Sequence, residues 1–493
     1  QQQFDTDPVL KVIQKILPNA LSLASAQDLE GYREALRASR YARAELRQLL
    51  KPLKGLSEFA KPLLRQALDA RFGPGFEPDT DTLFHPTLRP SGATGPATQL
   101  TLLEAALHNF ERAESANGGF LPSASINKGV AGPHPKNIKP EHFADLCRHL
   151  NIGRKYQDHL RDVLEPAFPP GDSPVGPRHS AQEIFIANDK ADMALYARAA
   201  CLRKDISASA LAAVLDVIKR GANAKFNDLP VALEYIQLFG VDIARVVIIK
   251  PRAIWTFTPV PLVLYVAQDP HTPFKEFTTL AELEDDLRSR LMSKSYQAFF
   301  ARVLGERVRA QFFSQLNRHL FKLAPVDGNW LTRGLWHKEP DHRADLRLET
   351  WPIDEELFAR MYRQQIDLIQ DNARFVAVPT EDEDAKSRQA RLQAWFSIGM
   401  NIANVASFLV PVLGQIMMVY ATVELVGEVY HGLEDISHDD FEEGFEHLVS
   451  AAANIAFMAA LAAAAHSATP PQPPPITSNN FVAQVVPITL ADG

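Results

Sequence analysis

Cysteines are scarce in this sequence, and the short motifs of several common enzyme classes are absent from it. Only Cys147 and Cys201 occur among 493 residues, too few for a disulfide framework, and their separation does not match zinc-ligand spacing. We expect both thiols to be free and mostly buried. The chain has no GxxxxGKS or GxxxxGKT phosphate loop, no GxSxG nucleophile elbow and no HExxH zinc helix. These absences argue against P-loop nucleotide enzymes, α/β-hydrolases and zinc proteases.

Two weaker chemical signals do not change this interpretation. Cys147 lies near His142 and His149, but proximity in sequence is a poor indicator of a thiol catalytic site, and a buried structural cysteine is the better reading. His337 and His342 flank a segment whose proline prevents the regular helical spacing of a metal-ligand pair. We therefore predict no catalytic residues, no metal site and no cofactor, and we expect any enzymatic activity to lie downstream of this chain.

Basic residues are absent from the last 102 residues of the chain. All 51 Lys and Arg lie at or before Arg391, whereas ten of the 59 Asp and Glu follow it. The formal net charge of −8 is therefore almost wholly a property of this C-terminal segment, because the part up to Arg391 carries a balance of +2. Such asymmetry indicates a region with its own partner or environment.

Within this segment, two apolar runs flank an acidic stretch. Residues 392–423 contain 32 residues without a charge, and residues 448–465 contain 18. Each run is near the roughly 20 apolar residues that span a bilayer. Between the two runs lies a stretch that we call the acidic connector, which carries twelve titratable side chains and no base: Glu424, Glu428, His431, Glu434, Asp435, His438, Asp439, Asp440, Glu442, Glu443, Glu446 and His447.

The pattern of this segment predicts a helical hairpin. Pro411 lacks an amide hydrogen and disfavours helical geometry at the residue before it, so it should divide the first run into two helices. On the second helix, Glu424, Glu428, His431 and Asp435 form one polar stripe. Because neighbouring negative charges repel one another, these carboxylates should take up protons more readily than isolated ones. We expect a hydrophobic hairpin, residues 392–466, with a pH-sensitive tip.

Membrane insertion and permanent burial are both compatible with this hairpin. Ten of the 18 residues in the second run are alanine, which enters lipid less readily than leucine, and a buried hairpin in a helical core would have a similar composition. The exclusion of every Lys and Arg favours insertion. The two interpretations are also compatible with each other, because a translocating hairpin must be buried before it inserts.

A basic stripe is predicted on one N-terminal helix. Ser25 and Asp28 form a start signal for a helix that should end at Leu50, before Lys51-Pro52. Its basic residues recur at three- and four-residue spacing, as expected for contact with an anionic surface: Arg33, Arg37, Arg40, Arg43 and Arg47. Interleaved glutamates favour an ordinary solvated face instead. We predict no nucleic-acid binding.

The remaining patterns define the fold class. A hydrophobic fraction of 46% is typical of a folded globular chain. Helices are expected over residues 100–116, 181–203, 206–220 with Asp205 as its cap, 354–372, and from the starts at Thr279 and Thr380. Three β-branched or aromatic runs, residues 244–249, 253–257 and 262–266, indicate an antiparallel meander. The prediction is a mainly α protein with a small antiparallel β-sheet (α+β), followed by the C-terminal hydrophobic helical hairpin.

Five segments are expected along the chain. Five prolines and two glycines make residues 166–179 a linker. It separates an N-terminal helical domain, residues 1–165, from an α+β domain, residues 180–391. The hairpin, residues 392–466, follows, and a proline-rich tail, residues 467–493, would connect to a downstream domain.

Several short stretches resemble the dermonecrotic-toxin N-terminal-like region of very large proteins from pseudomonads and related bacteria. The resemblance covers most of residues 80–466 and is carried by these stretches: Leu102-Leu-Glu-Ala-Ala-Leu-His-Asn-Phe110, Pro261-Leu-Val-Leu-Tyr-Val-Ala-Gln-Asp-Pro270, Arg374-Phe-Val-Ala-Val-Pro-Thr380, Ile398-Gly-Met-Asn-Ile-Ala-Asn-Val405, Val410-Pro-Val-Leu-Gly414 and Glu424-Leu-Val-Gly-Glu-Val-Tyr430. It brings no catalytic residues with it. The resemblance implies a non-enzymatic delivery region upstream of a separate effector, in some relatives leucine-rich repeats with a ubiquitin-ligase-like end.

Together, the residues and the resemblance predict a translocation or pore-forming module of a secreted bacterial toxin. Its expected partners are an anionic host membrane, an effector domain of the same polypeptide, and a host receptor or secretion chaperone. Its expected place of action is the host cell membrane or endosome. The runner-up is a soluble interaction scaffold within a large effector, with the hairpin as permanent core. A third alternative that stays open is an enzyme whose site is distributed among unrelated elements.

Overall fold

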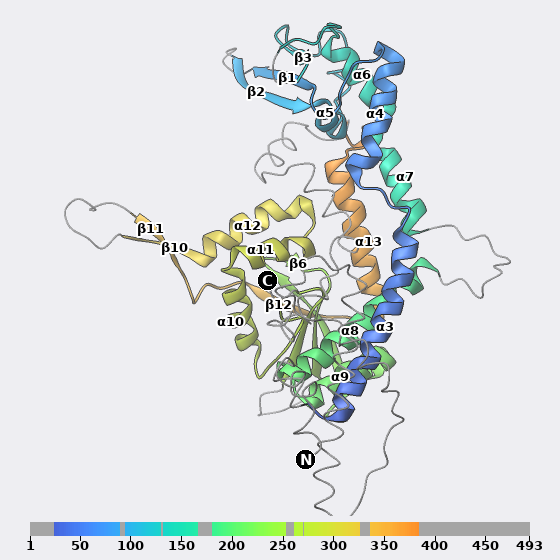
Figure 1. Cartoon of the computed structure of the whole chain (residues 1–493). Coiled ribbons are helices and arrows are strands. Elements are labelled where there is room, and N and C mark those ends of the chain that lie inside the picture. The colour runs from blue at the N-terminus through green and yellow to red at the C-terminus, as the bar shows by residue number, and fades with distance from the viewer. Residues whose placement is uncertain are drawn as a thin grey trace, which may run out of the picture.

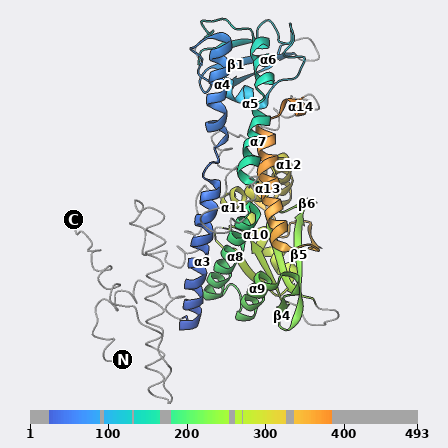
Figure 2. The same cartoon turned by 90° about the vertical axis from the view of Figure 1, so that its right-hand side faces the viewer.

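A computed structural model of the chain describes residues 24–88, 94–129, 132–165, 180–252, 261–269, 271–325 and 336–383. The expected linker, the apolar hairpin with Pro411 and the acidic connector, and the tail lie outside the described residues. The described part is elongated, with an upper lobe and a larger lower lobe joined by long helices (Figures 1 and 2).

The first described helix, α3 (Ala26–Leu50), begins and ends as the sequence predicts. The Ser25 hydroxyl accepts the N–H of Asp28 at 3.1 Å, which caps the start of the helix. Its predicted apolar side is buried: Leu29, Tyr32, Leu36, Leu46 and Leu50. This side packs along α8 (Ala181–Arg203), whose capping box joins Ser180 and Glu183.

The upper lobe combines helices with a small sheet that the sequence does not predict. Its three antiparallel strands follow the order β2-β1-β3. They are short or carry proline and glycine, which weakens any alternating pattern. The expected helix over residues 100–116 ends at His108, because Asn109 takes a positive φ of 60° and turns the chain. The elements are α4 (Leu56–Phe72), β1 (Thr82–Leu88), β2 (Thr94–Thr101), α5 (Leu102–His108), β3 (Ser125–Asn127), α6 (Pro140–Leu150) and α7 (Ile152–Leu164).

The lower lobe is built on one antiparallel sheet of the order β12-β5-β7-β8-β9, with β4 and β6 also paired to β5. The strands predicted at residues 244–249 and 262–266 are confirmed as β7 and β8, whereas residues 253–257 lie outside the described part. Strands β5 and β12 were not predicted. The strands are β4 (Lys225–Phe226), β5 (Leu229–Leu238), β6 (Val241–Asp242), β7 (Val246–Pro251), β8 (Leu262–Val266), β9 (Phe274–Phe277) and β12 (Leu348–Pro352).

Helices cover both faces of this sheet, which explains why β7 and β8 are apolar at almost every position. Val247 and Ile249 face α8, α9 (Ala208–Arg220) and the start of α13 (Leu357–Val376), while Val246 and Ile248 face the opposite helical layer. That layer consists of α10 (Leu280–Leu291), α11 (Lys294–Phe300) and α12 (Glu306–Leu320). A separate hairpin, β10 (Phe321–Pro325) with β11 (Trp336–Pro340), projects from the lobe (Figure 1).

Three helices of the lower lobe show how well local sequence signals predict where a helix begins. Thr279 caps α10 as predicted, by accepting the N–H of Glu282. Helix α9 (Ala208–Arg220) ends at Gly221 as expected, but its cap is Ser207 rather than Asp205. Two short 3-10 helices, η1 (Gly221–Asn223) and η2 (Ala301–Val303), complete the lobe. The last long helix, α13 (Leu357–Val376), begins three residues later than the predicted residue 354.

Helix α13 connects the two lobes. Leu357 and Met361 belong to the core beneath the sheet, whereas Ile366 and Val376 belong to the core of the upper lobe. A helix of 20 residues is about 30 Å long, which is enough to reach both. The core of the upper lobe therefore contains residues from both sides of the expected linker. Among the residues described, no helix combines the length and the apolar character needed to cross a bilayer.

Candidate functional site

The chain that leaves α13 folds onto the upper lobe before it enters the apolar segment. Residues 377–382, which we call the anchor, lie against α5, α6 and α7, and they include most of the short helix α14 (Thr380–Glu383) (Figure 2). Val376, Ala377 and Val378 are at most 3% exposed. Burial of these apolar residues fixes the place from which residues 384 onward depart.

The innermost contacts of the anchor are made with the turn after α5. The N–H of Val378 donates to the carbonyl of Leu107 at 2.8 Å. The side-chain amide of Asn109 donates to the carbonyl of Val378 at 3.2 Å and to the hydroxyl of Thr380 at 2.9 Å. Asn109 is 1% exposed, so these hydrogen bonds are shielded from water. The positive φ of Asn109 thus places its amide against the anchor.

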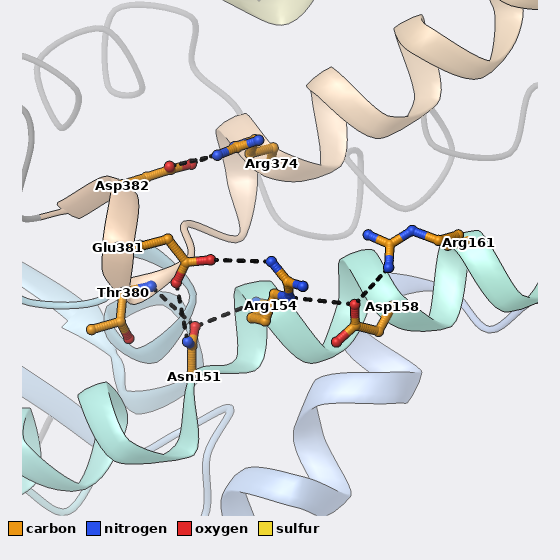
Figure 3. A network of polar contacts seen from close by, with 8 residues as sticks. All are labelled: Asn151, Arg154, Asp158, Arg161, Arg374, Thr380, Glu381 and Asp382. Carbon is orange, nitrogen blue, oxygen red and sulfur yellow. Dashed lines mark hydrogen bonds and ion pairs between the residues drawn. The ribbon is translucent and has the colours of Figure 1, made fainter.

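Asn151 joins three elements at one point (Figure 3). Its own N–H donates to the carbonyl of Cys147 and closes α6, while its side-chain oxygen accepts the N–H of Arg154 and opens α7. The same oxygen accepts the N–H of Thr380 at 3.0 Å. Its backbone is left-handed, with φ 46°, a conformation that asparagine tolerates better than most residues. The Thr380 hydroxyl completes the contact by donating to the carbonyl of Arg148 at 2.9 Å.

A half-exposed network of charges surrounds these buried contacts (Figure 3). Glu381 accepts from Asn151 at 3.3 Å and lies 3.6 Å from a guanidinium nitrogen of Arg154. Arg374, in the last turn of α13, donates to Asp382 at 2.6 Å, and these hydrogen bonds raise the pKa of its guanidinium. Exposed ion pairs of this kind contribute little to stability individually. These ion pairs orient the anchor. The buried hydrogen bonds and apolar contacts contribute most of the free energy that holds the anchor against the upper lobe.

Gly153 permits the close approach of the two backbones. A Cβ atom at this position would lie 2.5 Å from the nitrogen of Pro379 and 2.5 Å from the carbonyl carbon of Val378. Both are backbone atoms, which cannot rotate away as a side chain could. The first turn of α7 therefore needs glycine where the anchor crosses it.

The site residues predicted from the sequence fall into two groups, of which the structure describes one. The twelve titratable residues of the acidic connector, together with Pro411, lie outside the described part of the chain. The basic stripe lies on α3, where Arg33 pairs with Glu30 and Arg43 pairs with Asp192 of α8, each at 2.8 Å. The side chains of Arg43 and Asp192 are 10% and 11% exposed, so Arg43 takes part in the contact between α3 and α8. Contact of the stripe with an anionic surface stays a prediction.

The anchor residues were not predicted as a site. Thr380 was identified as a helix start and as the last residue of one family-like stretch, and α14 does begin there. The sequence Asn151-Ile-Gly153 between two amphipathic helices was the available signal, because asparagine and glycine at a helix junction indicate a left-handed residue or a close contact. Cys147 lies in the core of the upper lobe at 1% exposure. Within the described ranges, no group of three or more His, Cys, Asp or Glu is arranged to hold a metal ion.

These features define an α+β scaffold of two lobes, in which the anchor that follows α13 is held against the upper lobe. The family model of the dermonecrotic toxin N-terminal domain matches residues 50–307, just over half of the sequence, and the chain belongs to this family. A comparison with curated proteins finds no match. The family assignment confirms the resemblance seen in the sequence and gives the chain a toxin-associated role. The matched range contains Asn109, Asn151 and Gly153, and the anchor follows it.

Replacing Asn151 tests the junction. Asn151→Ala should lower the free energy of unfolding by about 3 kcal/mol, because it removes a helix cap and the acceptor for Thr380 and disfavours the left-handed backbone. Asn151→Gly retains the backbone freedom and should cost about 2 kcal/mol. Urea unfolding measures both. Equal stability of Asn151→Ala and the wild type would show that the junction does not hold the anchor.

Proposed function

We propose that this chain is the delivery region of a secreted bacterial toxin, in which the two-lobed body holds the hairpin of residues 392–466 close to a target membrane. Family membership supports the toxin role. The observation that carries the proposal is the anchor, which fixes the chain ten residues before the first apolar run begins at Leu392. Even fully extended, ten residues span about 35 Å. The base of the hairpin is therefore tethered to the body.

Acidification is the proposed trigger for insertion. The nine carboxylates of the acidic connector would each cost about 2.5 to 3.5 kcal/mol at the bilayer centre, or roughly 20 to 30 kcal/mol in total, if all were ionised. Protonation removes most of this cost, while the three histidines become positively charged and attract anionic headgroups. In this proposal, insertion is suppressed at neutral pH and released at endosomal pH.

The proposed partners follow from the arrangement of the chain. Anionic lipid is the surface that the protonated connector meets, and an effector in the same polypeptide is the cargo that follows residues 467–493. A host receptor or a secretion chaperone would act before insertion. The body itself is proposed to hold and position the hairpin, and we assign no chemical reaction to it.

Dye release from anionic vesicles tests this function. The wild-type chain should release dye about tenfold or more faster at pH 5 than at pH 7.5, because protonation lowers the cost of burying the connector. Zwitterionic vesicles at pH 5 are the control and should respond less, since they lack the headgroup charge that attracts the histidines. Equal release at both pH values would reject the proposal and favour a soluble interaction scaffold with the hairpin as permanent core.

A further inference from the structure

A row of basic side chains runs along the exposed side of α12 and onto the β10–β11 hairpin, which follows this helix directly (Figure 1). Arg307 and Arg318 are exposed on α12, and their spacing of about three helical turns puts them on one side of it. Lys322 of β10 and Lys338 of β11 are exposed on the hairpin. We call these four residues the basic row.

Positive charge is concentrated in this part of the sequence. Residues 292–325 contain six Lys and Arg but one acid, Glu306. Glu306 is buried and pairs with Arg309, so it does not offset the charges at the surface. The chain up to Arg391 carries a balance of only +2, which means that the rest of this part is slightly acidic. The positive excess of the body therefore lies around α11, α12 and the hairpin.

No carboxylate of the described residues neutralises the basic row. Arg318 donates through Nε to the carbonyl of Ser314 at 3.3 Å, an uncharged acceptor in its own helix. Glu339 stands opposite Lys322 in the register of the hairpin but forms no ion pair with it. The other acids on the elements around α12 make no ion pair with the row either: Asp242, Asp341, Asp367 and Asp371. In the part of the chain that the structure describes, the four cations are thus available to an acidic partner.

The surface at the middle of the basic row is hollowed. Gln315, Arg318 and His319 line an open hollow of about 230 Å³. The His319 ring packs against Phe239, with 5.0 Å between the ring centroids, which fixes one wall of the hollow. One water needs about 10–15 Å³, so the hollow has room for a whole carboxylate side chain beside the Arg318 guanidinium.

The β10–β11 hairpin at the end of the row is a two-stranded sheet that stands apart from the main sheet. Leu323 is 65% exposed on it, directly opposite Lys338 in the register. A two-stranded hairpin without further packing is marginally stable in water. A segment that packs on this hairpin would therefore stabilise it and remove Leu323 from water.

The acidic connector begins within reach of the basic row. The N–H of Glu306, at the start of α12, donates to the side-chain oxygen of Asn372 at 2.8 Å, which places this end of α12 beside the last turns of α13. The anchor follows α13, and residues 384–423, forty in number, separate the described chain from Glu424. Even if wholly helical, forty residues would span about 60 Å, whereas α12 is about 22 Å long.

We propose that the basic row is the docking surface of the acidic connector and holds it on the body before membrane insertion. The connector carries nine carboxylates and no Lys or Arg, with Phe441 and Phe445 among them, so it matches both the charge of the row and the exposed Leu323. Single exposed ion pairs are weak, but several of them act together when both partners belong to one chain. This inference rests on the proposed function: docking favours ionised carboxylates, so protons compete with the row and acidification releases the connector.

Carbodiimide cross-linking of the full chain at pH 7.5, without membrane, tests the docking. The reagent joins a lysine amine and a carboxylate in contact with it as an amide, and it takes up the water that is lost. The wild type at low salt should give cross-links from Lys322 and Lys338 to acids of residues 424–446, found by mass spectrometry after chymotryptic digestion. High salt should suppress them, because it screens exposed charges.

A variant that keeps both reactive lysines measures the contribution of the row. Arg307→Gln with Arg318→Gln should lower the yield of these cross-links about fivefold, because two of the four cations are lost. Lys204→Gln with Lys219→Gln is the matched control. It removes two exposed charges at the ends of α8 and α9, on the other side of the sheet, and should cross-link like the wild type.

Two outcomes would overturn the docking. One is the absence of cross-links between the hairpin lysines and the connector, and the other is an equal yield in the arginine variant. If cross-links were absent and the wild type bound anionic vesicles at pH 7.5 more strongly than the arginine variant, the basic row would be a lipid-binding surface instead.

The cross-linking result is separate from the test of the proposed function, because it needs no membrane. Acid-triggered dye release without cross-links would reject only the docking. Cross-links without dye release would support the docking and reject the delivery function. If both proposals are right, the arginine variant should release dye at a higher pH than the wild type, because fewer charges hold the connector on the body.

Discussion

Replacing Glu424 and Glu428 by lysine is expected to abolish acid-triggered dye release from anionic vesicles, and replacing both by glutamine is expected to move release to higher pH. The two residues stand one helical turn apart on the predicted polar stripe. Lysine stays charged at pH 5, so the pair would keep a cost of about 5 to 7 kcal/mol for burial in lipid, which corresponds to a loss of about a thousandfold or more. Glutamine carries no charge at either pH.

The control for this pair is a matched charge reversal outside the connector. Glu34 and Glu45 are exposed on α3, so Glu34→Lys with Glu45→Lys changes the net charge equally without touching the hairpin. This control should release dye as the wild type does at pH 5. The proposed acid trigger is wrong if the variant with lysine at both Glu424 and Glu428 releases dye as the wild type does. The measurement is the initial rate of fluorescence recovery as a function of pH.

Gly153→Ala is expected to destabilise the body of the protein as strongly as Asn151→Ala does. The added methyl group would meet three backbone atoms of the anchor at 2.5 to 2.6 Å, so the anchor and α7 must separate. Overpacking against atoms that cannot rotate away costs about 3 kcal/mol. Urea unfolding should show this loss. Trypsin should also cleave faster after Arg374, because separation of the anchor breaks its ion pair with Asp382.

Gly305 offers a matched control for this substitution. A methyl group there would lie 3.9 Å from the nearest atom, Cδ1 of Leu368, which is ordinary van der Waals contact. Gly305→Ala should therefore change stability by less than about 1 kcal/mol. If Gly153→Ala were equally mild, the backbone of the anchor would not be held against α7 as described.

The elements that the sequence predicted are those whose signals are local. Helix α3 starts at the Ser25 cap and α8 spans the predicted residues, because a cap and an apolar stripe depend on neighbours within one helical turn. Strands β7 and β8 could be predicted because helices cover both faces of the sheet, so almost every position in them favours an apolar residue. The absence of basic residues after Arg391, with the two apolar runs, is a property of sequence alone. The proposal of membrane delivery rests on this property.

Only the tertiary structure decided which distant residues meet. Strand β12 pairs with β5 more than 100 residues earlier, and the side-chain amide of Asn109 bonds Thr380 across 271 positions. Arg43 belonged to a regular basic stripe in the sequence, yet its partner is Asp192 on another helix. Nothing within a helical turn specifies such pairings, because they depend on how whole helices and sheets pack. The family and the charged segment could therefore be identified from the sequence, whereas the contacts of the anchor, residues 377–382, could be identified only from the tertiary structure.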